Sequence, residues 1–243
     1  MKAAVSTPNG LELRDIAEPV PKPNEVKVRV RACGLNRADL SAARATFGHG
    51  TIGAPVGLEF AGEVAEVGAE VKEFKAGDRV VCSAGGGYAE YAVADYGRTA
   101  PLPAGFSFEQ AAVLPVALNT LHNALLTRGR LKAGESVLIQ GASSGVGLMG
   151  LQIAKMKGAK PVMGSATNDM RRGRLKEFGA DIADRSASAS FCSASSSVAS
   201  RASRSLCHWE ICSVSWLSAL DSVVSSSWRD STRPVAEANS SLR

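Results

Sequence analysis

A glycine-rich segment in the middle of the chain constrains its fold more than any other feature. Residues 140–147 read Gln-Gly-Ala-Ser-Ser-Gly-Val-Gly, between an apolar run at 136–139 and a helix-like run at 148–157. A turn of this kind between a strand and a helix lets the backbone approach a pyrophosphate, whose charge then lies at the helix N-terminus. The spacing departs by one residue from the strict G-x-G-x-x-G pattern, and Ser144 stands where a glycine is common. The segment predicts a dinucleotide site, and a purely structural glycine turn is the alternative.

The residues around this turn alternate between strand-like and helix-like patterns. Ser107 fits the N-cap of an Ala/Leu-rich helix that we expect to run to about Thr127, with Pro115 inside it. The remaining predicted elements are strands at 136–140, 161–164 and 181–182 and helices at 147–158 and 168–178. This order is the βαβαβ half of a dinucleotide-binding fold.

The N-terminal part of the chain has the pattern of a compact, mostly β domain. Residues 25–32, EVKVRVRA, alternate between apolar and charged side chains as in a half-buried strand. A Pro-Asn-Gly turn joins two short apolar runs at 2–5 and 11–15. We expect a short helix at 36–45 and further strands at 57–67, 78–83 and 88–94. The predicted domains are therefore residues 1–106 and 107–185.

The sequence changes its character after Arg185. Residues 186–243 contain no glycine or lysine, are about one third serine, and hold all three tryptophans. They show no steady helical or alternating period, so little apolar burial offsets the entropy of ordering them. A change of reading frame or an aberrant splice near residue 185 explains this composition, and a genuine extension is the alternative. We expect this segment to be largely disordered, and function is inferred from the first 184 residues.

The composition excludes several classes of function. No apolar run is long enough to span a membrane, and no charged-then-apolar leader is present, so we expect a cytoplasmic protein with no membrane contact. The five cysteines form no C-x-x-C pair, which argues against a disulfide framework. The net charge of +5 comes without a long basic tract, so nucleic acid is not an expected partner.

Seven segments, in order, together resemble the medium-chain dehydrogenase/reductase family, in its quinone-oxidoreductase-like branch that lacks zinc. They are RACGLNRADL (31–40), PVGLEFAGEVAEVG (55–68), FKAGDRVV (74–81), GGYAEYAV (86–93), LPAGFSFEQAAVLPVALNT (102–120), LKAGESVLIQGASSGVG (131–147) and LKEFGAD (175–181). The resemblance implies an α/β plus β fold: a GroES-like β domain, then a partial Rossmann domain, with the active site in the cleft between them.

The resemblance also implies a metal-free site. Zinc-dependent members carry a cysteine and a histidine as ligands, at positions where this chain has Asn36 and Leu58. Glu59 is kept, but a catalytic zinc site needs about three protein ligands. Cys33 lies three residues from the cysteine position and is interpreted as a small buried apolar residue.

Without zinc, the resemblance implies hydride transfer from a nicotinamide to a small acceptor, either a quinone or an α,β-unsaturated carbonyl. Asn36 is the candidate donor to a developing oxyanion, and its alternative role is to cap the following helix. Asp39, the second candidate in the catalytic site, is expected to orient Asn36 or Arg37, or simply to lie in a first helical turn, rather than to act as a base. Ser41 and Phe47 occupy positions where some relatives have tyrosines, so no phenolic proton donor is assigned.

The candidate cofactor residues lie in the second domain. The glycine turn supplies Gly141, Ala142, Ser143, Ser144, Gly145, Val146 and Gly147. Thr120 matches a threonine that contacts the nicotinamide in relatives, and its alternative role is a bond to its own helix backbone. An NAD-specific fold places an acid after the second strand, where this chain has Ser165 and Thr167, followed by Arg171. Hydroxyl and guanidinium groups suit a 2′-phosphate, so NADPH is expected, with Asp169 as a mild counter-argument.

Two functions from different classes stay open. The first is an NADPH-dependent, zinc-independent reductase, whose intact relatives are expected to be homodimers. The second is a non-catalytic fragment that binds nucleotide or serves as an interaction module. The second follows from the tail, because nothing after Arg185 resembles the other half of a Rossmann sheet and the first strand is then left with an unpaired edge. We therefore expect little or no reductase activity from the chain as given.

Overall fold

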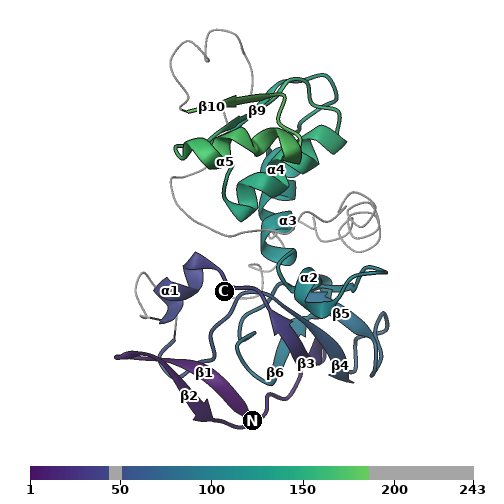
Figure 1. Cartoon of the computed structure of the whole chain (residues 1–243). Helices are drawn as coiled ribbons and strands as arrows, with labels where there is room; N and C mark the ends of the chain where they lie inside the picture. The colour runs from purple at the N-terminus through teal and green to yellow at the C-terminus, as the bar shows by residue number, and fades with distance from the viewer. Residues whose placement is uncertain (44–50, 186–243) are drawn as a thin grey trace, which may run out of the picture. The chain divides into compact units, whose positions relative to one another are not determined.

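The computed structural model describes residues 1–43 and 51–185, and it divides into two compact units (Figure 1). The first unit ends at Val113 and the second begins at Leu114, whereas the sequence pattern predicts a boundary at 106/107. The difference arises because helix α2 (Phe108–Ala112) packs on the sheet of the first unit, where Ala111 and Ala112 are buried. The predicted disorder of residues 186–243 lies outside the described residues.

The first unit is built on a five-stranded antiparallel sheet. Its strands, in spatial order, are β6 (Tyr91–Asp95), β3 (Glu25–Cys33), β4 (Phe60–Val67), β5 (Arg79–Cys82) and β7 (Thr99–Pro101). The short helix η1 (Tyr96–Arg98) leads from β6 into β7. Val26 and Val28 of β3 are fully buried against Phe60 and Val80, so the alternation expected at 25–32 is confirmed.

A separate hairpin of β1 (Lys2–Thr7) and β2 (Gly10–Asp15) completes this unit, as the turn signal predicts. Isolated bridges join β1 to Ala89 and Pro55. Helix α1 (Arg37–Ala43) follows β3 after a short loop, and its last residue accepts a hydrogen bond from the Ser6 hydroxyl at 3.1 Å. The mostly β domain expected for this part is confirmed.

The second unit contains a parallel three-stranded sheet in the order β10 (Ile182–Asp184), β9 (Val162–Ser165), β8 (Val137–Ile139). Helix α4 (Gly145–Met156) connects β8 to β9 and packs on both strands. Helix α5 (Asp169–Gly173) and the short helix η3 (Leu175–Phe178) connect β9 to β10. The fully buried Leu151, Val162 and Leu175 form the centre of this core. The partial Rossmann unit is as predicted.

The single helix expected from Ser107 to about Thr127 is wrong. Ser107 does cap α2 and forms a capping box with Gln110, but that helix ends at Ala112. A new helix, α3 (Pro115–His122), starts at Pro115 and continues as a π-helical segment, η2 (Asn123–Arg128). Proline has no N–H and its ring clashes within a helix, so it is accommodated at the first turn of α3. In the same way, the helix expected at 168–178 is divided into α5 and η3.

No helix within residues 1–43 and 51–185 has the length and apolar character needed to cross a bilayer.

Candidate functional site

The polar cluster, as we name it, consists of Asn36, Asp39, Glu59 and Tyr88 in the first unit. Asn36 ends the loop after β3, and Asp39 lies in the first turn of α1. Glu59 directly precedes β4, and Tyr88 precedes β6. Asp39 and Glu59 are both buried, at 4% and 3% exposure, although buried carboxylates are uncommon unless they are hydrogen-bonded.

Asn36 is held at both its side chain and its backbone. Its Nδ2 donates to Glu59 Oε1 at 2.8 Å, and its backbone N–H donates to Asp39 Oδ2 at 2.7 Å. These bonds do not correspond to the alternative role of Asn36, in which its amide caps α1. Its amide bonds to Glu59 instead, and the Asp39 carboxylate accepts a hydrogen bond from the backbone of Asn36. The expectation that Asp39 orients Asn36 agrees with this contact, whereas a catalytic role for either residue stays a prediction.

Tyr88 completes the cluster, and no motif in the sequence marks it as a site residue. Its hydroxyl donates to Asp39 Oδ2 at 2.6 Å, so this oxygen accepts two hydrogen bonds. Burial, reinforced by the neighbouring Asp39 carboxylate, raises the pKa of the Tyr88 phenol well above its usual range. The resemblance assigns no phenolic group near Asn36, and the structure supplies one from a different segment. The Phe47 position lies outside the described residues.

A close backbone approach lets Glu59 reach Asn36. A Cβ atom at Gly34 would lie 2.3 Å from Glu59 Oε1, so only glycine leaves room for the carboxylate in this position. The Gly34 N–H donates to the Glu59 carbonyl at 3.1 Å, which fixes the two segments together. Burial and then the charges of Asp39 and Glu59 raise the pKa of the half-buried Cys33 thiol, in keeping with a protonated, unreactive side chain.

The described part of the chain brings no three His, Cys, Asp or Glu side chains together as a metal site would need. Two positions carry zinc ligands in zinc-dependent relatives, and this chain has Asn36 and Leu58 there. The Asn36 amide is half-buried and the Leu58 side chain is 36% exposed, and neither is a strong zinc ligand.

The glycine turn of the second unit carries most of the candidate cofactor residues. A Cβ atom at Gly147 would lie 2.6 Å from both Ala142 Cα and the Gly141 carbonyl oxygen, so α4 can start this close to the turn only with glycine there. Ser144 is the N-cap of α4: its hydroxyl accepts from the Gly147 N–H at 3.0 Å and donates to the Gly141 carbonyl at 2.9 Å. Ser144 therefore replaces the common glycine for a structural reason.

The start of α4 leaves backbone donors available. No described residue accepts a hydrogen bond from the N–H groups of Gly145 or Val146, which are the first two residues of the helix. Unpaired N–H groups of this kind, together with the positive end of the helix dipole, favour a bound anion.

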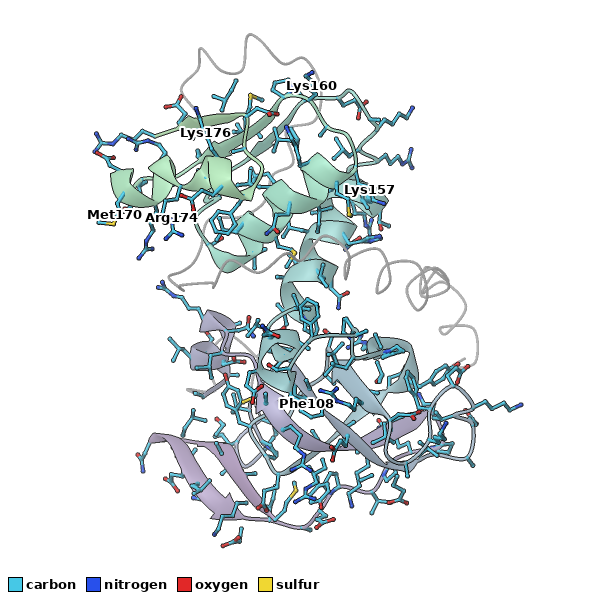
Figure 2. All side chains as sticks on the ribbon, turned by 45° about the vertical axis from the view of Figure 1, so that its right-hand side comes forward. Phe108, Lys157, Lys160, Met170, Arg174 and Lys176 are labelled. Carbon is cyan, nitrogen blue, oxygen red and sulfur yellow. The ribbon has the colours of Figure 1, made fainter. Side chains whose placement is uncertain are left out.

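The carboxyl end of β9 carries the residues expected to select the cofactor. Ser165 is buried, and its carbonyl accepts from the Ala142 N–H at 2.8 Å, which joins this strand end to the glycine turn. Thr167 is exposed, and Asn168 caps α5 by accepting from the Arg171 N–H at 3.0 Å. Asp169 forms an ion pair of 2.8 Å with Arg172, so its carboxylate is already engaged by a cation. Met170 and Arg174 extend outward from this segment (Figure 2).

Thr120 lies on α3 with its side chain exposed, and its hydroxyl exchanges no hydrogen bond with any described residue. The alternative of a bond to its own helix backbone is therefore not what the structure has. The predicted residues thus fall into two sets: Asn36 and Asp39 in the first unit, and Thr120, the glycine turn, Ser165, Thr167 and Arg171 in the second.

Comparison with known proteins agrees with this division. Residues 22–104 match the family described as the alcohol dehydrogenase GroES-like domain. The quinone oxidoreductase of Homo sapiens is 41% identical over 164 residues, which cover 65% of this chain and 49% of that protein. The quinone oxidoreductase of Pseudomonas aeruginosa is 37% identical over 180 residues, which cover 73% of this chain and 55% of that protein. The chain therefore spans about half the length of these relatives.

Solved structures give the same result. An alcohol dehydrogenase superfamily protein from Novosphingobium aromaticivorans superposes with a TM-score of 0.70 at 34% identity, covering 76% of this chain and 58% of that one. The Escherichia coli quinone oxidoreductase, in a complex with NADPH, superposes with a TM-score of 0.65 at 31% identity, covering 75% and 57% respectively. By sequence and by fold, the chain is similar to the quinone-oxidoreductase-like proteins of the medium-chain dehydrogenase/reductase family.

Proposed function

We propose that this chain carries the site of an NADPH-dependent oxidoreductase that reduces a quinone or an α,β-unsaturated carbonyl without zinc. The observation that carries the proposal is the 2.8 Å hydrogen bond from Asn36 Nδ2 to Glu59 Oε1. Through this bond the Glu59 carboxylate is engaged by the neutral amide of Asn36. Asn36 stands at the position where zinc-dependent relatives have a cysteine ligand. One carboxylate and one amide are a poor donor set for zinc but a suitable set for orienting a hydrogen-bond donor.

The glycine turn and the end of β9 fit a nicotinamide dinucleotide phosphate. The N–H groups of Gly145 and Val146 suit the pyrophosphate, and Gly147 permits its close approach. Ser165, Thr167 and Arg171 would hold the 2′-phosphate through hydroxyl and guanidinium donors, in a strand end without an acid. Ala142 and Ser143 line the same turn, and the exposed Thr120 is proposed to contact the carboxamide. When bound, the reduced nicotinamide supplies a hydride.

Asn36 is proposed to act on the acceptor. One of its two Nδ2 protons is directed to Glu59, which leaves the other proton for the oxygen on which negative charge develops. A conjugated acceptor suits this arrangement, because it spreads the charge and needs only orientation and a hydrogen bond. Asp39 then acts on the backbone of Asn36 and does not serve as a base, since its Oδ2 already accepts two hydrogen bonds and its Oδ1 is buried.

A second candidate function is nucleotide binding without catalysis. It is favoured by the described sheet of the second unit, which has three strands, whereas ligands in complete folds of this class bind at the switch point between two half-sheets. Homodimerisation and a cytoplasmic location stay predictions.

The test uses the 243-residue chain after washing with a chelator. NADPH is titrated by its fluorescence, its oxidation is followed with a panel of quinones and enones, and zinc is measured by elemental analysis. Binding with zinc-independent turnover supports the oxidoreductase, and binding without turnover supports the second candidate. Failure to bind NADPH, or turnover that requires stoichiometric zinc, would contradict the proposal.

A further inference from the structure

We propose that Tyr88 is a positioning residue that fixes Asn36 through the carboxylate of Asp39. The consequence for catalysis rests on the function proposed above, whereas the positioning itself does not. Tyr88 lies 49 positions from Asp39 in the sequence, so the bond between them joins two distant segments of the first unit.

Within residues 1–43 and 51–185, two donors reach the carboxylate of Asp39. Tyr88 Oη and the Asn36 N–H approach the same oxygen, Oδ2, at 2.6 and 2.7 Å. The other oxygen, Oδ1, is buried without a hydrogen-bond partner in the described part of the chain. A buried carboxylate with so few donors relies heavily on each of them, and an O–H donor at this distance makes a strong charge-assisted bond. Removing the phenol therefore leaves the Asn36 N–H as the one described donor to this carboxylate, so Asp39 is held less firmly beside Asn36.

Tyr88 is itself anchored through its backbone. Its N–H donates to the Val56 carbonyl at 2.8 Å, and its carbonyl accepts from the Ala4 N–H at 2.8 Å. The ring is half-buried, and its hydroxyl also lies 3.4 Å from the Gly34 carbonyl. The phenol is thus a fixed donor that ties the loop carrying Asn36 to strand β1 and the segment before β6.

Asn36 is therefore held from two directions. Glu59 sets the direction of its carboxamide, because a carboxylate can only accept and so turns Nδ2 toward itself. Asp39, fixed by Tyr88, sets the position of its backbone. Both restraints are needed for the remaining Nδ2 proton to point in one direction, since either one alone leaves a torsion free.

The test compares Tyr88→Phe with Tyr91→Phe, which removes the hydroxyl of a nearby half-buried tyrosine that is not in the polar cluster. Nuclear magnetic resonance follows the backbone and side-chain amides of Asn36 in the full chain. Tyr88→Phe is expected to shift both signals and to raise the hydrogen-exchange rate of the Asn36 N–H by about tenfold, as the loss of one hydrogen bond would. Tyr91→Phe leaves both unchanged. Unchanged Asn36 signals in Tyr88→Phe would overturn the proposal.

A second variant decides the matter if Tyr88→Phe does not fold. The ionisable groups that act on the phenol are Asp39 of α1 and Cys33 of β3, and Glu59 before β4 acts on Cys33 and bonds to Asn36. Asp39→Asn removes the carboxylate that the Tyr88 hydroxyl faces, so tyrosinate absorbance should appear at lower pH than in the wild type. A titration identical to that of the wild type would show that the two groups are not in contact, and would also overturn the proposal.

The catalytic consequence has its own measurement. If the wild type turns over, Tyr88→Phe should lower kcat for a quinone by about tenfold while the Kd for NADPH stays the same. If the wild type has no turnover, the oxidoreductase proposal fails, and the Asn36 signals still decide the role of Tyr88. Equal kcat values for Tyr88→Phe and Tyr91→Phe, with Asn36 displaced, would show that positioning has no catalytic effect.

Discussion

The two sets of candidate residues are encoded in different ways. The glycine turn is a continuous run from Gly141 to Gly147, in which neighbours along the chain bond to one another. The polar cluster is assembled from three distant segments, so Asn36 meets Glu59 across 23 positions and Asp39 meets Tyr88 across 49. Local chemistry can be recognised in a sequence, whereas contacts made by the β-sheet cannot. If the two sets are also independent in energy, a substitution in one should leave the other intact.

The largest effect is expected at the glycine turn. Gly147→Ala would place a methyl group 2.6 Å from Ala142 Cα, so the turn must move away from the start of α4. We expect NADPH affinity to fall by about a hundredfold, which corresponds to the upper end of the overpacking range. Gly173→Ala is the matched control, because an added Cβ there has no atom within 4 Å. Equal affinity for the two variants, measured by NADPH fluorescence, would contradict the close approach.

Gly34→Ala tests the polar cluster in the same way. Its added methyl group would overlap Glu59 Oε1, so the carboxylate must leave Asn36. We expect the free energy of unfolding to fall by about 1–3 kcal/mol, with the Asn36 side-chain amide signals displaced and NADPH affinity unchanged. Gly85→Ala, where an added Cβ has no atom within 4 Å, should match the wild type in thermal and denaturant unfolding. A loss of NADPH affinity in Gly34→Ala would show that the two sets are coupled.

Arg171→Ala tests the choice of cofactor. If its guanidinium pairs with the 2′-phosphate, the substitution should weaken NADPH binding by about tenfold, the value of one hydrogen bond to a charged group. NADH lacks this phosphate and serves as the control, with nearly the same Kd before and after the change. Equal losses for both cofactors would assign the Arg171 side chain a structural role, because its backbone hydrogen bond to Asn168 is kept in the variant.

The smallest effect concerns Cys33. Burial and the charges of Asp39 and Glu59 raise the pKa of its thiol, so less thiolate is present at mildly alkaline pH. Alkylation with iodoacetamide, followed by mass spectrometry of the Cys33 peptide, should be slower than for a small thiol. Glu59→Gln removes one of the charges and should accelerate it by about two- to threefold. Cys82, fully buried with its pKa raised to about 12, should be unreactive in both proteins, as a control for unfolding.

Sequence patterns reach most of the fold but only part of the site. The alternation at 25–32 and the turn at 141–147 identify β3 and the β8–α4 junction, because both signals are local. The pattern of apolar residues predicts one helix with Pro115 inside it, because the pattern continues from α2 into α3. In the structure Pro115 is the first residue of α3. Tyr88 stands in a segment that contributes only to the family resemblance. Its place in the sequence gives no sign of its contact with Asp39, because the pairing of β3 with β6 brings the two residues together.

Gly34 shows the same limit on a smaller scale. In the sequence it is one glycine in a loop after a strand, with no turn signal that distinguishes it. Its importance comes from the Glu59 side chain, which occupies the space that a Cβ would take. A close approach between distant segments leaves no local pattern in the sequence, so such glycine positions are recognised only in the folded structure.

Asn36 is the residue on which the proposed chemistry depends. The most direct test compares chelator-washed wild type with Asn36→Ala. For each protein, quinone-dependent oxidation of NADPH and the Kd for NADPH are measured. We predict that the turnover of the wild type is low, because the chain spans about half the length of its relatives, and that this turnover needs no added zinc. Asn36→Ala should lose turnover while its Kd is unchanged, because the oxyanion donor belongs to the first unit and the cofactor residues belong to the second. Equal turnover in the two proteins, or turnover restored by added zinc alone, would contradict this prediction.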